Sequence, residues 1–207
     1  MSMTKRWKRP VLVAVGLVLG GCGNLGVPAA RFAFFDLGIA EPVTPPLPLT
    51  RVEVRAPSWL STGAMQYRID YRQPAQREAY SETRWVAEPA EMLRLALDRA
   101  LVPDSSSSGG KCRLRLELDE FVQVFETAHD SHAIIIARPV LIAPRSDDVV
   151  VQNTFVIREP APTPDAAGGV IAHRRAAGRL AHGISVWIAG LDPANPQGLN
   201  TLERCKR

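Results

Sequence analysis

Residues 112–126, CRLRLELDEFVQVFE, form the most regular secondary-structure pattern in the chain. Charged and apolar residues alternate with a period of two, which predicts a β-strand with one buried face. Phe121 and Phe125 fall on the charged side by strict alternation, so either a β-bulge turns them inward or they form an apolar surface patch. The predicted apolar face consists of Leu114, Leu116, Leu118, Val122 and Val124, and the charged face of Arg113, Arg115, Glu117 and Asp119.

Two more strand patterns follow, each after a short turn. HAIIIARPVLIA, residues 132–143, is apolar on both faces and predicts a central strand covered on both sides. Pro139 cannot donate a hydrogen bond and limits how regular the ladder of this strand can be. Residues 149–159 supply one further strand. Three strands joined by short turns predict an antiparallel meander.

The rest of the chain adds weaker strands and two helices. Residues 31–38, 51–57 and 67–72 have short strand patterns, and the proline-rich residues 41–50 predict an extended connector. Two segments, 87–101 and 169–191, change to helical spacing. We therefore predict an α+β fold: a single domain with a mixed or antiparallel sheet of about five strands and two helices packed on it. The predicted helix stripes are Met92, Leu93, Ala96, Leu97, Ala100 and Leu101, then Ala177, Leu180, Ala181, Ile184, Trp187, Ile188 and Leu191.

The first 21 residues have the pattern of a secretory leader. Four basic residues precede a short apolar run, and small residues follow it, as in signal peptides. Leu19, Gly20, Gly21 and Cys22 resemble the lipobox of bacterial lipoproteins. This resemblance implies a diacylglycerol on the Cys22 thiol, cleavage before Cys22 and acylation of its new amine. The alternatives are an ordinary signal peptide with an incidental cysteine, or an uncleaved anchor.

The net charge of the chain comes from this leader. The sequence has 25 Lys and Arg against 21 Asp and Glu, and residues 1–21 contain four bases and no acids. The remaining chain is formally neutral, which gives no support for nucleic-acid binding. It retains about 185 residues, enough for one domain with its own core. Cys112 and Cys205 remain as a possible disulfide, since an oxidising compartment permits pairing but spacing does not decide it.

Residues with catalytic potential are few. His129, Asp130 and His132 form an H-x-x-H pattern on a predicted turn, where the alternatives are a metal-binding pair and ordinary turn residues. The sequence has no G-x-S-x-G elbow, P-loop or G-x-G-x-x-G pattern. We therefore expect no catalytic residues, no metal site and no cofactor.

Several short motifs together resemble the ABC-type transport auxiliary lipoproteins, the family of PqiC-like lipoproteins that accompany MCE lipid-transport systems. They are Cys22, FFDLG at 34–38, VEVRAPSWLSTGAMQYR at 52–68, SETRWVAEPAEML at 81–93, LELDEFVQVFE at 116–126 and VWIAGL at 186–191. Within SETRWVAEPAEML, the motif at 81–93, Arg84, Trp85 and Pro89 carry the strongest likeness. We expect Arg84 and Trp85 at the start of the first helix, with the indole in the core and Arg84 bonded to nearby carbonyls. Pro89 suits the first helical turn.

The resemblance implies an organisation and a role. It divides the chain into a leader (1–21), an anchor with first strand and connector (22–50), an auxiliary-lipoprotein domain (51–191) and a polar tail (192–207). It implies a non-enzymatic accessory that is held by its acyl chains at the periplasmic face of the outer membrane. Gly23, which is not Asp, favours sorting of the lipoprotein to that membrane. Its expected partners are an MCE protein with its ABC permease and ATPase, and further copies of itself. The alternatives are a structural lipoprotein of another envelope assembly or secretion complex, and a lipid-modifying or metal-dependent enzyme using His129, Asp130 and His132.

Overall fold

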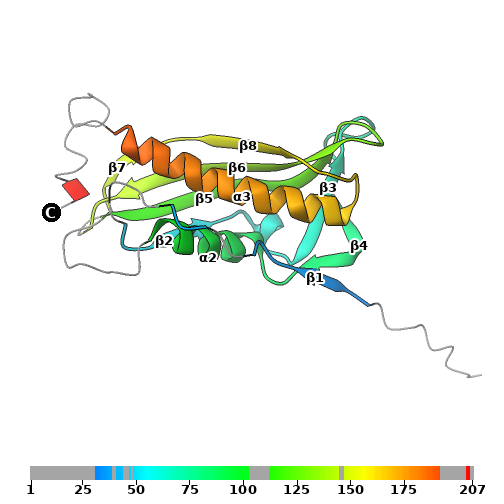
Figure 1. Ribbon diagram of the computed structural model, residues 1–207, viewed down its shortest axis with the longest axis horizontal. Coiled ribbons are helices and arrows are strands. Elements are labelled where there is room, and N and C mark those ends of the chain that lie inside the picture. Colours follow the sequence, from blue (N-terminus) through cyan, green and yellow to red (C-terminus); the bar gives the residue numbers. More distant parts are fainter. Residues whose placement is uncertain are drawn as a thin grey trace, which may run out of the picture. The chain divides into compact units, whose positions relative to one another are not determined.

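Eight strands form one mixed sheet in the computed structural model, which describes residues 31–38, 41–43, 47, 49–102, 112–144, 147–191 and 204–205 (Figure 1). The residues in these ranges also form two α-helices and one short 3-10 helix. The α+β class is confirmed, although the sheet has more strands than the five expected. The strands are β1 (Ala33–Phe35), β2 (Val52–Arg55), β3 (Ala64–Ile69), β4 (Glu78–Trp85), β5 (Arg113–Phe125), β6 (Ser131–Ile142), β7 (Val149–Gln152) and β8 (Phe155–Pro160), and the helices are η1 (Ser58–Leu60), α2 (Pro89–Leu101) and α3 (Ala166–Ala189).

The long hairpin of β5 and β6 forms the centre of the sheet. These strands pair antiparallel from Arg113↔Ile142 to Phe125↔Ser131. On the free side of β5, β2 and β3 both run parallel to it, one beside each half. Beyond β3 lie the antiparallel β4 and then β1, which runs parallel to β4 at the edge. The parallel pairs explain why the sheet is mixed, while the predicted antiparallel meander is confirmed for β5, β6 and the strands that follow.

Pro139 accounts for a break that the sequence pattern did not show. Residues 149–159 were predicted as one strand, but they form β7 and β8, which both pair with β6. The β8 ladder ends at Ala137↔Phe155, and the β7 ladder starts at Val140↔Gln152. Proline has no N–H to donate. The Asn153 amide donates to the Pro139 carbonyl at 3.1 Å between the two ladders.

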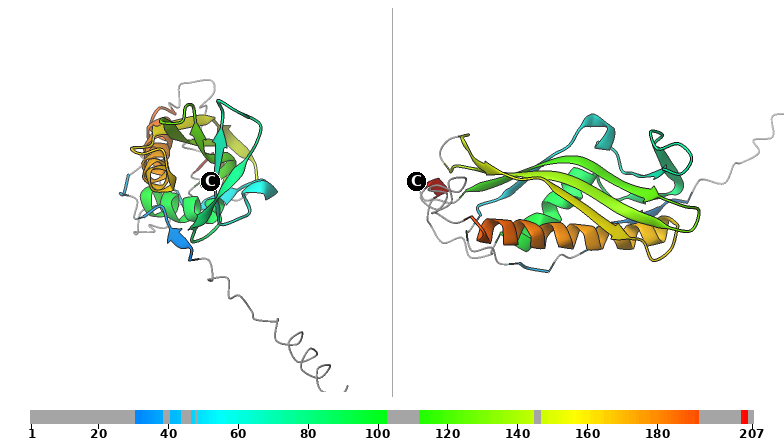
Figure 2. Two further views of the ribbon diagram at one scale, coloured as in Figure 1. Left: turned by 90° about the vertical axis from the view of Figure 1, so that its right-hand side faces the viewer. Right: turned by 90° about the horizontal axis from the view of Figure 1, so that it is seen from above.

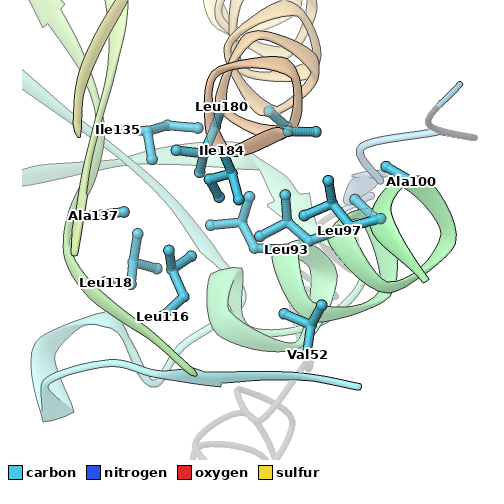
Figure 3. Packing of buried hydrophobic residues seen from close by; sticks show 14 of the residues in the cluster. Val52, Leu93, Leu97, Ala100, Leu116, Leu118, Ile135, Ala137, Leu180 and Ile184 are labelled. Atoms are coloured by element: carbon cyan, nitrogen blue, oxygen red, sulfur yellow. The ribbon is translucent and has the colours of Figure 1, made fainter. Parts of the chain in front are cut away.

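Both helices lie on the concave side of the curved sheet (Figure 2). All six residues of the predicted α2 stripe are buried, and so are Leu180, Ala181 and Ile184 of α3. These side chains meet Leu116, Leu118 and Ile135 of the sheet (Figure 3). The helical period thus places one apolar stripe per helix against one face of the sheet.

A β-bulge at Asp119 corrects the face assignment of β5. The pairing shifts between Leu118↔Ala137 and Glu120↔Ile136, so Asp119 is an extra residue that reverses the alternation. Phe121 therefore turns into the main core, where 2% of it is exposed. The expectation that Val122 and Val124 continue the face of Leu118 is wrong, because they form a second small cluster with Ile134 on the opposite face.

Two other segments differ from the sequence patterns. Residues 78–85 form β4, although no strand was predicted there, and Arg84 and Trp85 end this strand rather than begin a helix. The connector at 41–50 contributes Leu47 and Leu49 to the core, with 6% and 1% of their surfaces exposed. The connector therefore supplies core side chains as well as linking elements.

Candidate functional site

A groove lies between α2, α3 and the segment after β1. Its volume is about 690 Å³. The two helices contact each other directly, and both contribute small residues to the lining, which lets the groove penetrate between them. Its apolar lining is Leu37, Val43, Ala96, Ile171, Ala177 and Gly178, and its polar lining is Glu41, Arg174, Arg175 and His182.

The charge along this groove is unbalanced. Arg174 and Arg175 are adjacent on the exposed side of α3, and in the part of the chain that the structure describes neither forms an ion pair. Among the described residues of the lining, Glu41 is the one that is acidic. An apolar lining beside two guanidinium groups that have no ion-pair partner among the described residues suits an amphiphilic ligand with an anionic group.

Gly38 shapes the end of the groove nearest to β1. Its φ of +71° lies in the left-handed region, and the Asp36 carboxylate accepts a hydrogen bond from its amide at 2.7 Å. A Cβ on Gly38 would lie 2.7 Å from Nη2 of Arg174. Glycine therefore meets both the backbone requirement and the close approach of the arginine.

Trp85 lies in the core beneath α3. Only 3% of it is exposed, and its ring makes edge contacts with Phe121 at 5.6 Å and His173 at 5.4 Å between centroids. Arg84 points away and donates to the carbonyl oxygens of Thr83 and Tyr80. Pro89 occupies the first turn of α2. The contacts of Trp85, Arg84 and Pro89 therefore indicate structural roles for these three residues.

His173 is a buried titratable group within the same aromatic cluster. Its ring packs against Phe121 at 4.4 Å, and Nδ1 lies 2.8 Å from the Gly169 carbonyl. Burial lowers the pKa of His173 to about 4, and the Gly169 hydrogen bond opposes this shift. The imidazole is therefore neutral at pH 7 and is enclosed in the core, away from the groove.

Gln123 and two glycines fix the start of α3, a feature that none of the sequence patterns predicts. Gln123 is fully buried, donates to Ser131 Oγ and the Asp165 carbonyl, and accepts from the Tyr80 hydroxyl. A Cβ on Gly169 would lie 2.0 Å from Gln123 Oε1, and one on Gly168 would lie 2.0 Å from a backbone oxygen. The adjacent glycine pair was the available sequence signal.

The convex face carries polar side chains beside the small cluster of Val122, Val124 and Ile134, and Arg68 is the register partner of Val124. Glu120, with 8% of its surface exposed, binds two arginines, Arg68 and Arg77. Their long side chains belong to β3 and to the turn before β4. The stems of such residues cover apolar surface while the charged ends pair.

The residues of the H-x-x-H pattern lie in two different elements and have different hydrogen-bond partners. His129 and Asp130 lie in a turn in which both backbone amides donate to Thr127 Oγ1. His132 lies on β6, with Nδ1 3.6 Å from a Glu126 oxygen and Nε2 3.2 Å from Nη1 of Arg158. Burial lowers the pKa of His132. Among the residues with described positions, no group of His, Cys, Asp and Glu could hold a metal ion.

The three cysteines divide into a described pair and one outside the described residues. Cys112 and Cys205 form a disulfide with their Cα atoms 4.8 Å apart, and both are fully buried. Leu19, Gly20, Gly21 and Cys22 lie outside the described residues. None of the helices that are described has the length and hydropathy needed to span a bilayer.

Comparison with known proteins agrees with the fold and adds the family. Protein XCC0632 from Xanthomonas campestris, of the family DUF330, superimposes with a TM-score of 0.60 at 16% identity, covering 75% of this chain and 94% of its own. A second solved structure, an uncharacterized protein, gives 0.58 at 11% identity, covering 76% of this chain and 99% of its own. These two likenesses show the fold alone.

The sequence itself matches a known family over most of the domain. No curated protein matches the chain. The family described as the ABC-type transport auxiliary lipoprotein component matches residues 45–185, a range that includes every strand except β1 and all of α2. The chain therefore belongs to the ABC-type transport auxiliary lipoprotein family.

Proposed function

We propose that this protein is a non-enzymatic accessory of an ABC-type MCE system that moves lipid or another hydrophobic solute between membranes. In this proposal Cys22 carries the acyl chains, residues 1–21 are removed, and the domain at 51–191 faces the periplasm from the outer membrane. The observation that carries the proposal is the family match over residues 45–185, downstream of a basic and then apolar segment that is followed by Cys22. The role is docking, in which the tethered domain receives the distal end of the tunnel or passes on its cargo.

The groove between α2 and α3 supports binding of cargo. Its volume of about 690 Å³ falls within the range of small-molecule sites. Arg174 and Arg175 favour an anionic head group, while Leu37, Ala96 and Ile171 favour an apolar tail. We therefore assign the groove to an anionic phospholipid.

Charge reversal tests this assignment. The intact lipoprotein carrying both Arg174→Glu and Arg175→Glu is compared with Arg99→Glu, which reverses an exposed charge on α2 outside the groove lining. Native mass spectrometry in detergent measures bound phosphatidylglycerol. The double variant should bind it about tenfold more weakly, a change of about 1.4 kcal/mol. Equal binding by both proteins would remove the groove from the proposal.

The partners are tested by isolating the membrane-extracted protein from its native cells. We expect an MCE protein with its permease and ATPase among the companions, and a particle larger than one copy of the chain. Mass spectrometry of the same sample should show cleavage before residue 22 and acyl groups on it. Companions from a secretion or outer-membrane assembly complex would instead support the structural-lipoprotein alternative.

The enzyme alternative has a separate test. His129→Ala combined with His132→Ala should leave the transport phenotype unchanged, because the two histidines lie in a turn and a strand with separate hydrogen-bond partners. The measurement is complementation of a deletion strain by the double variant at equal protein level. A null phenotype would restore the enzyme alternative.

A further inference from the structure

Two exposed phenylalanines lie at the first strand: Phe34 belongs to β1, and Phe32 directly precedes it. Phe34 has 62% of its surface exposed, the largest fraction among the large apolar residues with described positions, and Phe32 has 42%. Val86, which is 56% exposed, follows the strand that pairs with β1, and its amide donates to the Phe35 carbonyl at 2.9 Å. Three exposed apolar side chains therefore gather at the β1–β4 edge, and such a patch marks an interaction surface.

Arg84 holds this aromatic pair in place. Its guanidinium lies over the Phe32 ring at 4.7 Å and donates to the Thr83 carbonyl at 3.0 Å. The rings of Phe32 and Phe34 meet edge to face at 6.4 Å, and Phe34 is the register partner of Arg84. The two rings therefore project from a fixed strand, with a cation directly behind them.

The position of the patch in the sequence indicates what covers it. Cys22 precedes Phe32 by ten residues, and a fully extended chain spans at most about 3.6 Å per residue, or about 36 Å in all. This is about the length of α3, whose 24 residues rise 1.5 Å each. An acylated Cys22 thus keeps β1 closer to the bilayer than any later strand must be.

We propose that Phe32 and Phe34 insert into the surface of the bilayer that holds the acyl chains of Cys22. Aromatic side chains on a fixed element bury their rings at the boundary between head groups and acyl chains. The Arg84 cation then lies at the level of the lipid phosphates. This inference rests on the proposed acylation of Cys22.

The contact has a consequence for the groove. Leu37, two residues beyond the end of β1, belongs to the groove lining. Insertion of β1 therefore places one end of the α2–α3 groove beside the lipid head groups. Lipid can then pass between bilayer and groove without the domain leaving the surface.

Depth-dependent quenching tests the proposal on the intact lipoprotein. Phe34→Cys is labelled with an environment-sensitive fluorophore, and Val156→Cys, at a site 55% exposed on β8, is the matched control. Labelling is selective because Cys112 and Cys205 form a disulfide and Cys22 is acylated in the proposed protein. Both proteins are reconstituted into phosphatidylethanolamine and phosphatidylglycerol vesicles in which part of the lipid carries bromine on its acyl chains.

We expect brominated lipid to remove at least about half of the emission at position 34, because interfacial side chains reach 5–10 Å into the bilayer. The control at position 156 should change little, and adding Phe32→Ser should reduce the quenching at position 34. Equal quenching at positions 34 and 156 would overturn the inference. A blue shift at position 34 without quenching would also overturn it, because a second copy paired to the open edge of β1 would then cover the label.

The same sample separates this failure from failure of the proposed function. Mass spectrometry that shows acylated Cys22 together with an unquenched label rejects only the insertion of β1. Absence of acyl groups rejects the anchored placement, and the insertion with it.

Discussion

The two faces of the sheet bury their apolar side chains by different means. On the concave face, α2 and α3 cover Leu116, Leu118 and Phe121 through apolar and aromatic contacts. On the convex face, no described helix covers Val122 and Val124, and the paired charges of Glu120, Arg68 and Arg77 lie there instead. One residue, Asp119, separates these two arrangements along β5. The difference teaches that a strand buried on both faces need not have a second layer of elements, because long charged side chains can cover a small apolar cluster.

The largest effect is expected on the concave face, from Trp85→Ala. Removal of the indole leaves Phe121 and His173 without their edge contacts and creates a cavity. Large aromatic to alanine changes in cores cost about 3–5 kcal/mol. Urea denaturation followed by circular dichroism measures this free energy of unfolding. A loss below about 1 kcal/mol, the size of an ordinary surface change, would contradict a packing role for Trp85.

The second effect is a pH dependence that originates in the same cluster. His173 has a pKa of about 4 in the folded protein and an ordinary value of 6.5 when unfolded, so the unfolded chain binds the proton more readily. The stabilisation is complete above pH 6.5 and is lost as the pH falls towards 4, by about 3 kcal/mol in total. The difference in free energy of unfolding between wild type and His173→Gln should be smaller at pH 4.5 than at pH 7. Only the wild type loses stabilisation as His173 takes up a proton. Parallel curves for the two proteins would show that His173 is not the titrating group.

The third effect compares two glycines of α3. Gly169→Ala places a methyl group against Gln123 Oε1 and should destabilise the fold by about 1–3 kcal/mol through overpacking. Gly178→Ala is the matched control, because no atom other than those of its chain neighbours and its own helix backbone lies within 4 Å of its Cβ position. Alanine should stabilise the helix there by up to about 1 kcal/mol. Thermal melting of both variants measures the contrast, and equal melting temperatures would mean that Gln123 shifts without penalty.

The fourth effect moves to the convex face. Glu120→Gln removes the charge that Arg68 and Arg77 share and should destabilise the fold by about 1–3 kcal/mol. Glu117→Gln, three residues earlier on β5, is the control, since its ion pair with Arg115 is more exposed. Urea denaturation should show the larger loss for Glu120. The reverse order would show that the convex cluster does not depend on this charge network.

The smallest effect is expected from Arg138→Gln. Arg138 donates to both oxygens of Asp119 at 2.7 Å, but its side chain is 52% exposed, so water and salt screen the pair. The variant should unfold with nearly the wild-type free energy, and any difference should vanish at high salt. A salt-independent loss larger than that of Glu120→Gln would reverse the ranking of the two ion-pair sites.

The long elements were predictable because each repeats one period over many residues. The α2 stripe from Met92 to Leu101 and the alternation from Leu114 to Leu118 both correspond to buried faces. The turn after Phe125 and the alternative of a bulge that turns Phe121 inward were also available from the sequence. These features depend on neighbours within one element, which a linear pattern records.

The rest depends on contacts between distant residues. The β4 segment, EAYSETRW, has little apolar alternation, and its place in the sheet comes from pairing with β1 and β3. The face of Val122 and Val124 is set by one extra residue at Asp119, which no period contains. Likewise the groove combines residues of α2, α3 and the segment after β1, so its lining could not be assembled from any one motif.

During oxidative folding, Cys112 has to pair with the correct one of two other cysteines. Its partner in the disulfide lies 93 residues further along the chain, whereas the thiol of Cys22 is synthesised before both. A wrong bridge between Cys22 and Cys112 would leave Cys205 unbridged. Attachment of diacylglycerol converts the Cys22 sulfur into a thioether, which takes no part in thiol exchange. In the proposed lipoprotein, the modification that fastens the chain to the membrane therefore also leaves Cys112 with a single possible partner.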